Sequence, residues 1–224
     1  MHIPDGFING TTSAAAGVVA AGGVGVAIRQ TGRYMTERQV PLAGLVAAFV
    51  FAAQMFNFPV LPGMSGHLLG GVLAAVLVGP WAGLLIITVV LMVQAVFVAD
   101  GGLSALGLSV VNMGLIGTLV GYLIYRAILG VAPRSATGVT VSAGIAAFLS
   151  VPLAAMGFVV EYAIGGTASA SVGAVFTAMV GTHLLIGIGE GILTALVIGA
   201  VMASRPDLVY GNPLYQGERT EVLA

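Results

Sequence analysis

The sequence predicts an all-α polytopic membrane protein of about seven transmembrane helices, in a single integral membrane domain over residues 1–224. Hydrophobic residues make up 58% of the chain and charged residues only 7%, whereas soluble domains carry about 25% charge. No Asp, Glu, Lys or Arg occurs between Arg38 and Asp100 or between Arg134 and Glu161. Such stretches accommodate helices of about 20 apolar residues, the length that crosses a bilayer. The 34 glycines lack an every-third-residue repeat and suit helices that pack closely in lipid.

Proline, glycine and charged residues divide the chain into apolar segments. The helices expected from this division cover residues 11–28, 40–58, 66–79, 81–99, 103–129, 136–160 and 173–203. The third segment is short, so we expect it to be half-buried or tilted. Strands are not expected, because the apolar runs exceed strand length and do not alternate.

The arginines predict the orientation of these helices. With seven spans, every basic residue falls on one side, which the positive-inside rule makes cytoplasmic: Arg29, Arg33, Arg38, Arg126, Arg134, Arg205 and Arg219. The other side carries Asp5, and also Asp100 and Glu161, which we interpret as caps at outer helix ends. The N-terminus is then outside, and the polar tail of residues 205–224 is cytoplasmic. The opening residues lack the basic region of a signal peptide, so Met1 is expected to be the mature first residue.

Composition excludes several classes of protein. The net charge is −1, so no basic surface is available for nucleic acid. The absence of Cys excludes disulfides, thiolate zinc sites and Cys nucleophiles. The seven basic residues are all Arg, so the lysine of a phosphate-binding P-loop is missing. Any transport energy must therefore come from another chain.

The start of the chain, residues 1–10, is a candidate metal-chelating segment. The Met1 amine, the His2 amide nitrogen and the His2 imidazole follow one another. Amine and amide close a five-membered ring on a metal ion, and amide and imidazole close a six-membered ring. Three nitrogens in a plane leave one corner of a square open, which suits Ni(II) or Cu(II). The alternative is that His2 is an ordinary residue in a frayed terminus.

His67 can fill the open corner, because the predicted topology places its loop on the same side as the N-terminus. We expect Ser65 to cap the following helix and His67 to lie in its first turn. Gln54 and Asn57, just upstream, can orient the imidazole from outside the metal shell, and Ser65 is a further candidate for this role. Equally, His67 can be a hydrogen-bonded loop residue, and the two amides can bond to backbone.

His183 and Glu190 form a second polar pair. They are seven residues apart, so they share one face of a helix. The spacing differs from the HExxH metalloprotease pattern. A proton relay, an interior polar lock and a partner surface are all compatible with it, and we favour a structural role.

Two motifs, MHIPDGF at the start and PGMSGHLLGG around His67, resemble the CbiM/NikM family. These are the nickel- and cobalt-specific substrate-binding (S) components of energy-coupling factor (ECF) transporters, a type of ABC importer. The resemblance implies a multi-pass protein of the cell membrane whose N-terminus inserts into the helical body from outside. It also implies that Met1, His2 and His67 bind the metal.

The same resemblance implies partner chains: a transmembrane T component, two cytoplasmic ATPases and often a small N subunit. The expected function is capture of Ni²⁺ as the transported substrate, with no catalytic cofactor and no enzymatic activity. Nickel is preferred because the removable presequence of many cobalt members is missing. The alternatives are the same role for Co²⁺, an ATP-independent metal channel or exporter, and an intramembrane enzyme that uses His183 and Glu190.

Overall fold

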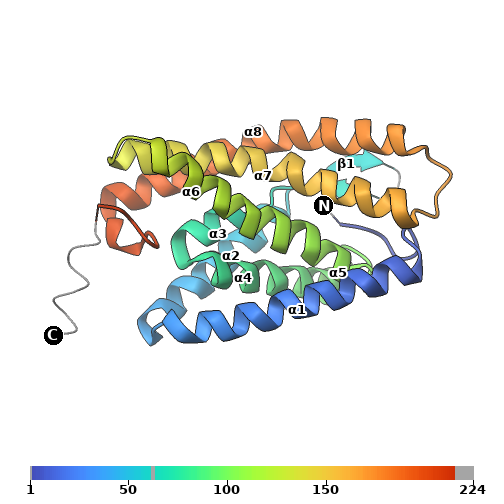
Figure 1. Cartoon of the computed structure of the whole chain (residues 1–224), viewed down its shortest axis with the longest axis horizontal. Helices are drawn as coiled ribbons and strands as arrows, with labels where there is room; N and C mark the ends of the chain where they lie inside the picture. The colour runs from blue at the N-terminus through green and yellow to red at the C-terminus, as the bar shows by residue number, and fades with distance from the viewer. Residues whose placement is uncertain (1, 62–63, 215–224) are drawn as a thin grey trace.

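The computed structural model describes residues 2–61 and 64–214, which form a helical bundle with one short hairpin (Figure 1). The helices are α1 (Gly10–Tyr34), α2 (Val40–Gln54), α3 (Gly71–Val78), α4 (Pro80–Val93), α5 (Leu106–Ser109), α6 (Gly121–Val131), α7 (Ala136–Gly165) and α8 (Val172–Ser204). Two π-helical stretches, η2 (Gln94–Val98) and η3 (Val110–Val120), extend α4 and join α5 to α6. Short 3-10 turns occur at η1 (Glu37–Gln39) and η4 (Pro206–Leu208).

Within the described residues the chain therefore contains seven continuous helical segments, and the all-α prediction is confirmed. Five of them are long and apolar enough to cross a bilayer: Gly10–Tyr34, Pro80–Val98, Leu106–Val131, Ala136–Gly165 and Val172–Ser204. The second segment, α2, has 15 residues, and α3 has only 8. The third helix, expected over residues 66–79, is therefore even shorter than the sequence predicts.

The chain before α3 differs from the helix expected to begin at residue 66. Strands β1 (Phe58–Leu61) and β2 (Met64–Gly66) pair antiparallel, although no strand was expected. Ser65 lies in β2 instead of capping a helix, and His67 lies in an extended segment, residues 67–70, before α3 begins. Extended backbone is tolerated at membrane depth where protein surrounds it. Here other helices supply that surrounding.

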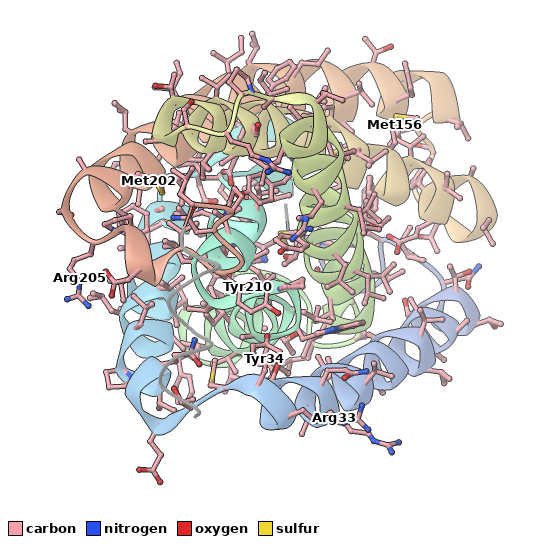
Figure 2. The ribbon with its side chains drawn as sticks, turned by 60° about the vertical axis from the view of Figure 1, so that its left-hand side comes forward. Arg33, Tyr34, Met156, Met202, Arg205 and Tyr210 are labelled. Carbon is pink, nitrogen blue, oxygen red and sulfur yellow. The ribbon has the colours of Figure 1, made fainter. Side chains whose placement is uncertain are left out.

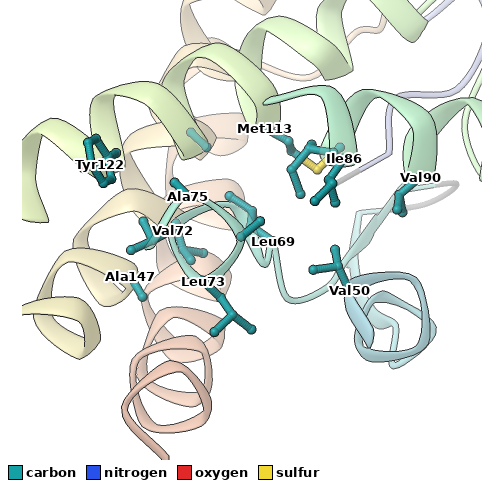
Figure 3. Packing of buried hydrophobic residues seen from close by; sticks show 14 of the residues in the cluster. Val50, Leu69, Val72, Leu73, Ala75, Ile86, Val90, Met113, Tyr122 and Ala147 are labelled. Carbon is teal, nitrogen blue, oxygen red and sulfur yellow. The ribbon is translucent and has the colours of Figure 1, made fainter. Parts of the chain in front are cut away.

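All eight residues of α3 are buried, as expected for a helix that is apolar on every face. Figure 3 shows Val72, Leu73 and Ala75 of α3 inside a shell of side chains from other elements. That shell includes Val50 of α2, Ile86 and Val90 of α4, Met113 of η3, Tyr122 of α6 and Ala147 of α7. Helix α3 and the extended segment before it therefore lie along the centre of the bundle.

Gly70 makes the change from extended chain to helix possible. Its φ is +72°, and a Cβ built there would lie 2.8 Å from Cγ2 of Val50. We expect Gly70→Ala to lower stability by at least about 1–2 kcal/mol, because the left-handed conformation disfavours a Cβ. Gly44→Ala is the matched control: a Cβ there meets nothing within 4 Å, and helix propensity favours alanine by about 0.5–1 kcal/mol. Thermal unfolding in detergent should give shifts of opposite sign, and equal shifts would contradict this account.

The two ends of the bundle differ in charge as the arginines predicted. One end gathers Tyr34 and Tyr210, whose ring centroids are 5.4 Å apart, with Arg33 and Arg205 at its edge (Figure 2). The described arginines lie in or beside the helix ends at this side of the bundle: Arg29, Arg33, Arg38, Arg126, Arg134 and Arg205. Arg219 lies outside the described residues. Which side of the membrane this end faces stays a prediction.

The first part of the polar tail packs against the arginine end of the bundle. The backbone N–H of Tyr210 donates to the carbonyl of Val76 in α3, over 2.8 Å. Val209 and Asn212 are buried there as well. Residues 215–224 lie outside the described residues.

Candidate metal-binding site

The N-terminal segment lies inside the bundle at the end opposite the arginines. Ile3 and Ile8 are buried, and the Phe7 ring lies 5.4 Å from that of Tyr162. The carbonyl of Ile3 accepts a hydrogen bond from the N–H of Gly102 (2.8 Å), and the N–H of Asn9 donates to the carbonyl of Gly165 (2.7 Å). Contacts from the connection after η2 and from the end of α7 therefore hold residues 2–9 in place.

Asp5 ties this segment to the connection after η2. Its carboxylate accepts hydrogen bonds from the side chain and the backbone N–H of Ser104, over 2.5 and 2.9 Å. These bonds lower the pKa of the Asp5 carboxyl below its usual value, so it stays ionised. The connection and the N-terminal segment thus form one unit.

His2 is buried against the loop that carries His67. The two ring centroids are 4.6 Å apart with a tilt of 33°, and His2 forms an isolated antiparallel bridge with Ser65 of β2. Burial lowers the pKa of His2 to about 2. The imidazole is therefore neutral at pH 7, as a metal ligand must be.

His67 is fully buried at the start of the extended segment. Its Nδ1 lies 2.6 Å from the carbonyl oxygen of Leu68. Because a carbonyl only accepts, Nδ1 carries the proton and Nε2 carries the lone pair. Burial lowers the pKa of His67 well below its usual value. A backbone carbonyl that holds one ring nitrogen is the usual support for a histidine that binds metal through the other.

Glu190 in α8 anchors the chain directly after His67. Its two carboxylate oxygens accept the backbone N–H groups of Leu69 and Gly70, over 2.8 and 2.7 Å. From α2, Nε2 of Gln54 donates to the carbonyl of Leu69 over 2.7 Å. Two helices therefore supply partners for the N–H and carbonyl of Leu69 and for the N–H of Gly70, a task that a continuous helix would perform itself.

His183, two turns before Glu190, lies against the same segment. A Cβ built at Gly66 would be 3.2 Å from Cε1 of His183. Its Nδ1 lies 2.7 Å from the carbonyl of Met179, and its buried Nε2 has no hydrogen-bond partner among the described residues. His183 and Glu190 are both buried in the protein interior. The pair therefore packs against the loop of His67, which is compatible with the structural role favoured from the sequence.

The other expected supports of His67 take different partners. Nδ2 of Asn57 donates to Oδ2 of Asp100 over 3.1 Å, and Ser65 faces His2 through the bridge already described. Asp100, interpreted from the sequence only as a helix cap, lies beside His2, with 3.4 Å between Oδ2 and Nε2 of the histidine. The sequence around Asp100 indicates a helix end, but nothing in it points to His2.

Glu161 differs from the expected outer cap. It lies inside α7, one turn before the helix ends at Gly165. Its Oε2 accepts a hydrogen bond from Nδ2 of Asn112 in η3, over 2.6 Å. The interpretation as a loop cap was wrong, because α7 continues past residue 160 and a neighbouring helix supplies a polar partner.

Side chains alone do not complete a metal site here. Within residues 2–61 and 64–214, no three His, Asp or Glu side chains are placed to hold one ion. The remaining expected donors are main-chain nitrogens at the start of the chain. Met1 lies outside the described residues, so its amine is not part of this geometry.

Comparison with known proteins agrees with this architecture. The sequence matches the CbiM family, described as a cobalt uptake substrate-specific transmembrane region, over residues 2–208. It is 37% identical over 210 residues to a putative fused nickel transport protein NikMN of Archaeoglobus fulgidus, covering 93% of this chain and 68% of that protein. It is 34% identical over 212 residues to the cobalt transport protein CbiM of Geobacter sulfurreducens, covering 93% and 61%.

A solved structure of a truncated transition metal transporter has the same fold. The TM-score is 0.84 at 30% sequence identity, and the match covers 91% of this chain and 99% of that chain. Family match and fold agree over nearly the full length, and the chain therefore belongs to the CbiM family.

Proposed function

We propose that this protein is the substrate-binding membrane subunit of an ECF-type importer and that its substrate is Ni²⁺. The ion is captured at the outer face by four nitrogens: the Met1 amine, the His2 amide, the His2 imidazole and the His67 imidazole. The nickel and cobalt transport relatives support a role in metal uptake. The observation that carries the ligand set is the close pair of imidazoles, His2 and His67.

The spacing of the two rings fits adjacent corners of a square. With metal–nitrogen bonds of about 2.1 Å, each ring centroid lies about 3.2 Å from the ion. Two imidazoles on adjacent corners are then about 4.5 Å apart, and on opposite corners about 6.4 Å. The observed centroid distance is 4.6 Å. This value supports the adjacent arrangement, in which the two main-chain nitrogens of the N-terminus occupy the other corners.

Capture releases protons mainly from the main chain. Both imidazoles are already neutral at pH 7, because burial lowers the pKa of each. The Met1 amine, with a reference pKa of about 7.7–8.0, must lose its proton to bind. Loss of the His2 amide proton adds a strong donor and places negative charge beside the dication. The ion with its ligands then has a lower net charge than the free dication, so less charge is buried in the bundle.

The transport step requires other chains. The sequence contains no Lys and therefore no P-loop, so ATP hydrolysis belongs to separate ATPase subunits. The transmembrane T component couples those ATPases to this subunit, and a small N subunit is a further candidate partner. The protein itself binds and carries the ion and catalyses no reaction.

The test adds one alanine ahead of Met1. The extra residue places the histidine third in the chain, so that amine, two amides and imidazole supply four nitrogens and leave no corner for His67. We expect this variant to retain a nickel complex but lose uptake. Native mass spectrometry in an equimolar nickel–cobalt mixture verifies the first residue and measures which ion each form holds. We expect nickel in the unmodified protein.

A second variant separates the chelate from general disturbance of the N-terminus. Asp5→Asn keeps Met1 and His2 in place and keeps an oxygen for the Ser104 bonds, and it should take up nickel. Normal uptake by the alanine-extended chain, with His67 still bound to nickel, would refute the four-nitrogen site. Cobalt occupancy in the equimolar mixture would favour the cobalt alternative.

A further inference from the structure

Asp100, in the connection between η2 and α5, faces His2 of the N-terminal segment. Oδ2 of Asp100 is 3.4 Å from Nε2 of His2. That nitrogen is buried and has no hydrogen bond among the described residues. The same Oδ2 accepts a hydrogen bond from Asn57 over 3.1 Å, which holds the carboxylate beside the ring. A buried ring nitrogen and a fixed acceptor are therefore within a small rotation of a hydrogen bond.

The proposed chelate requires one particular nitrogen of His2. The six-membered ring that contains the His2 amide nitrogen closes through Nδ1, because that ring passes through Cα, Cβ and Cγ. Nδ1 must then carry the lone pair, and Nε2 must carry the proton. In a buried site that N–H needs an acceptor, since a buried donor without a partner is destabilising.

We propose that Asp100 is a positioning residue for His2: its carboxylate accepts a hydrogen bond from the Nε2–H and so presents the Nδ1 lone pair to the metal. The proposal rests on the proposed function, because it concerns the same four-nitrogen site. Metal-binding histidines commonly donate their second N–H to a carboxylate, which fixes the ring and strengthens the ligand. Asp100 plays this part for His2, as the carbonyl of Leu68 does for His67.

Gly101 supports the same assignment from the other edge of the ring. A Cβ built at Gly101 would lie 2.9 Å from Nδ1 of His2, and the residue has a φ of +95°. A side chain at residue 101 would therefore crowd the Nδ1 edge, which glycine avoids, while its neighbour Asp100 faces the Nε2 edge. The next residue, Gly102, bonds the carbonyl of Ile3 over 2.8 Å. Three successive residues of one connection thus contact the N-terminal segment.

The experiment compares Asp100→Leu with Asp100→Asn in the full-length protein. Leucine removes the acceptor, and we expect nickel affinity to fall by about 10- to 100-fold, the usual effect of losing such a support. Asparagine retains an oxygen acceptor, and we expect a loss of no more than about threefold. Asp207→Asn, which removes a charge at the arginine end, should bind nickel as the unmodified protein does.

A second measurement reports on the ring itself. The chain has three histidines, so ¹⁵N-labelled histidine gives few signals, and His2→Gln assigns those of His2. In the metal-free protein the shifts of His2 should show Nε2–H. Asp100→Leu should move them toward a mixture of tautomers, and Asp100→Asn should restore them. If Asp100→Leu does not fold, Asp100→Ala replaces it in both measurements.

Two results overturn different claims. Unchanged nickel affinity and unchanged His2 shifts in Asp100→Leu would overturn the role of Asp100 and leave the four-nitrogen site intact. Unchanged nickel binding in His2→Gln and His67→Ala would overturn the site itself, and with it the proposed function.

Discussion

Nickel affinity is expected to fall by about 100-fold or more when His67 is replaced by alanine. Loss of a residue that only supports a ligand costs about 10- to 100-fold, and loss of the ligand itself should cost at least as much. His67 is fully buried, and its ring lies 4.6 Å from that of His2. Without the His67 imidazole, the fourth corner of the square would pass to water. Competition titration against a chelator measures the affinity, and the visible absorption of square-planar nickel reports the geometry.

His183→Gln is the control for this substitution. His183 is equally buried and packs against Gly66, next to His67, but it is not in the proposed ligand set. We expect its loss to lower the affinity by less than about tenfold, the lower end of the effect of a supporting group. If both substitutions weakened binding equally, the effect of His67 would have to be attributed to packing.

Removing the carboxylate of Glu190 is expected to have the second large effect. Glu190→Ala leaves the backbone N–H groups of Leu69 and Gly70 buried and without the acceptor that each now has. At about 1–3 kcal/mol for each unpaired group, the variant should lose about 2–6 kcal/mol of stability. Nickel binding should weaken in parallel, because the segment that carries His67 would lose its anchor. Thermal unfolding and nickel titration on the same sample measure both effects.

The stability of Glu190→Gln should lie between those of the unmodified protein and Glu190→Ala. Its amide oxygen accepts one of the two N–H groups, while its NH₂ group opposes the other. Glu37→Ala, at an exposed position in η1, controls for the loss of one glutamate. A Glu190→Ala protein that melted at the temperature of the Glu37→Ala protein would show that the carboxylate does not hold the segment.

The sequence allowed the meeting of His2 and His67 to be predicted, while their role as metal ligands stays a prediction. The shared side of the N-terminus and the His67 loop followed from counting helices and sorting arginines. His2 and His67 are indeed adjacent in the structure. The chelating order of amine, amide and imidazole follows from covalent connectivity alone, and it stays a prediction because Met1 lies outside the described residues.

The local form of the His67 loop could not be predicted. Its apolar composition favours a helix from residue 66, but the chain forms β2 and an extended segment instead. The cause lies far away in the sequence: Glu190 binds the N–H groups of Leu69 and Gly70. A carboxylate more than a hundred residues distant leaves no mark on the local pattern. The pairing of Glu161 with Asn112, and the contact of Asp100 with His2, escaped prediction for the same reason.

By itself, the sequence determined the helical class of the protein, its long apolar segments and the separation of charge between its two ends. These properties follow from hydrophobic length and from the cost of burying charge in lipid, both of which are local. Only the tertiary structure decided where the central helix α3 begins, which side chains hold the extended segment and what faces each histidine. Such choices depend on polar groups that must find partners inside the bundle, and those partners come from other helices.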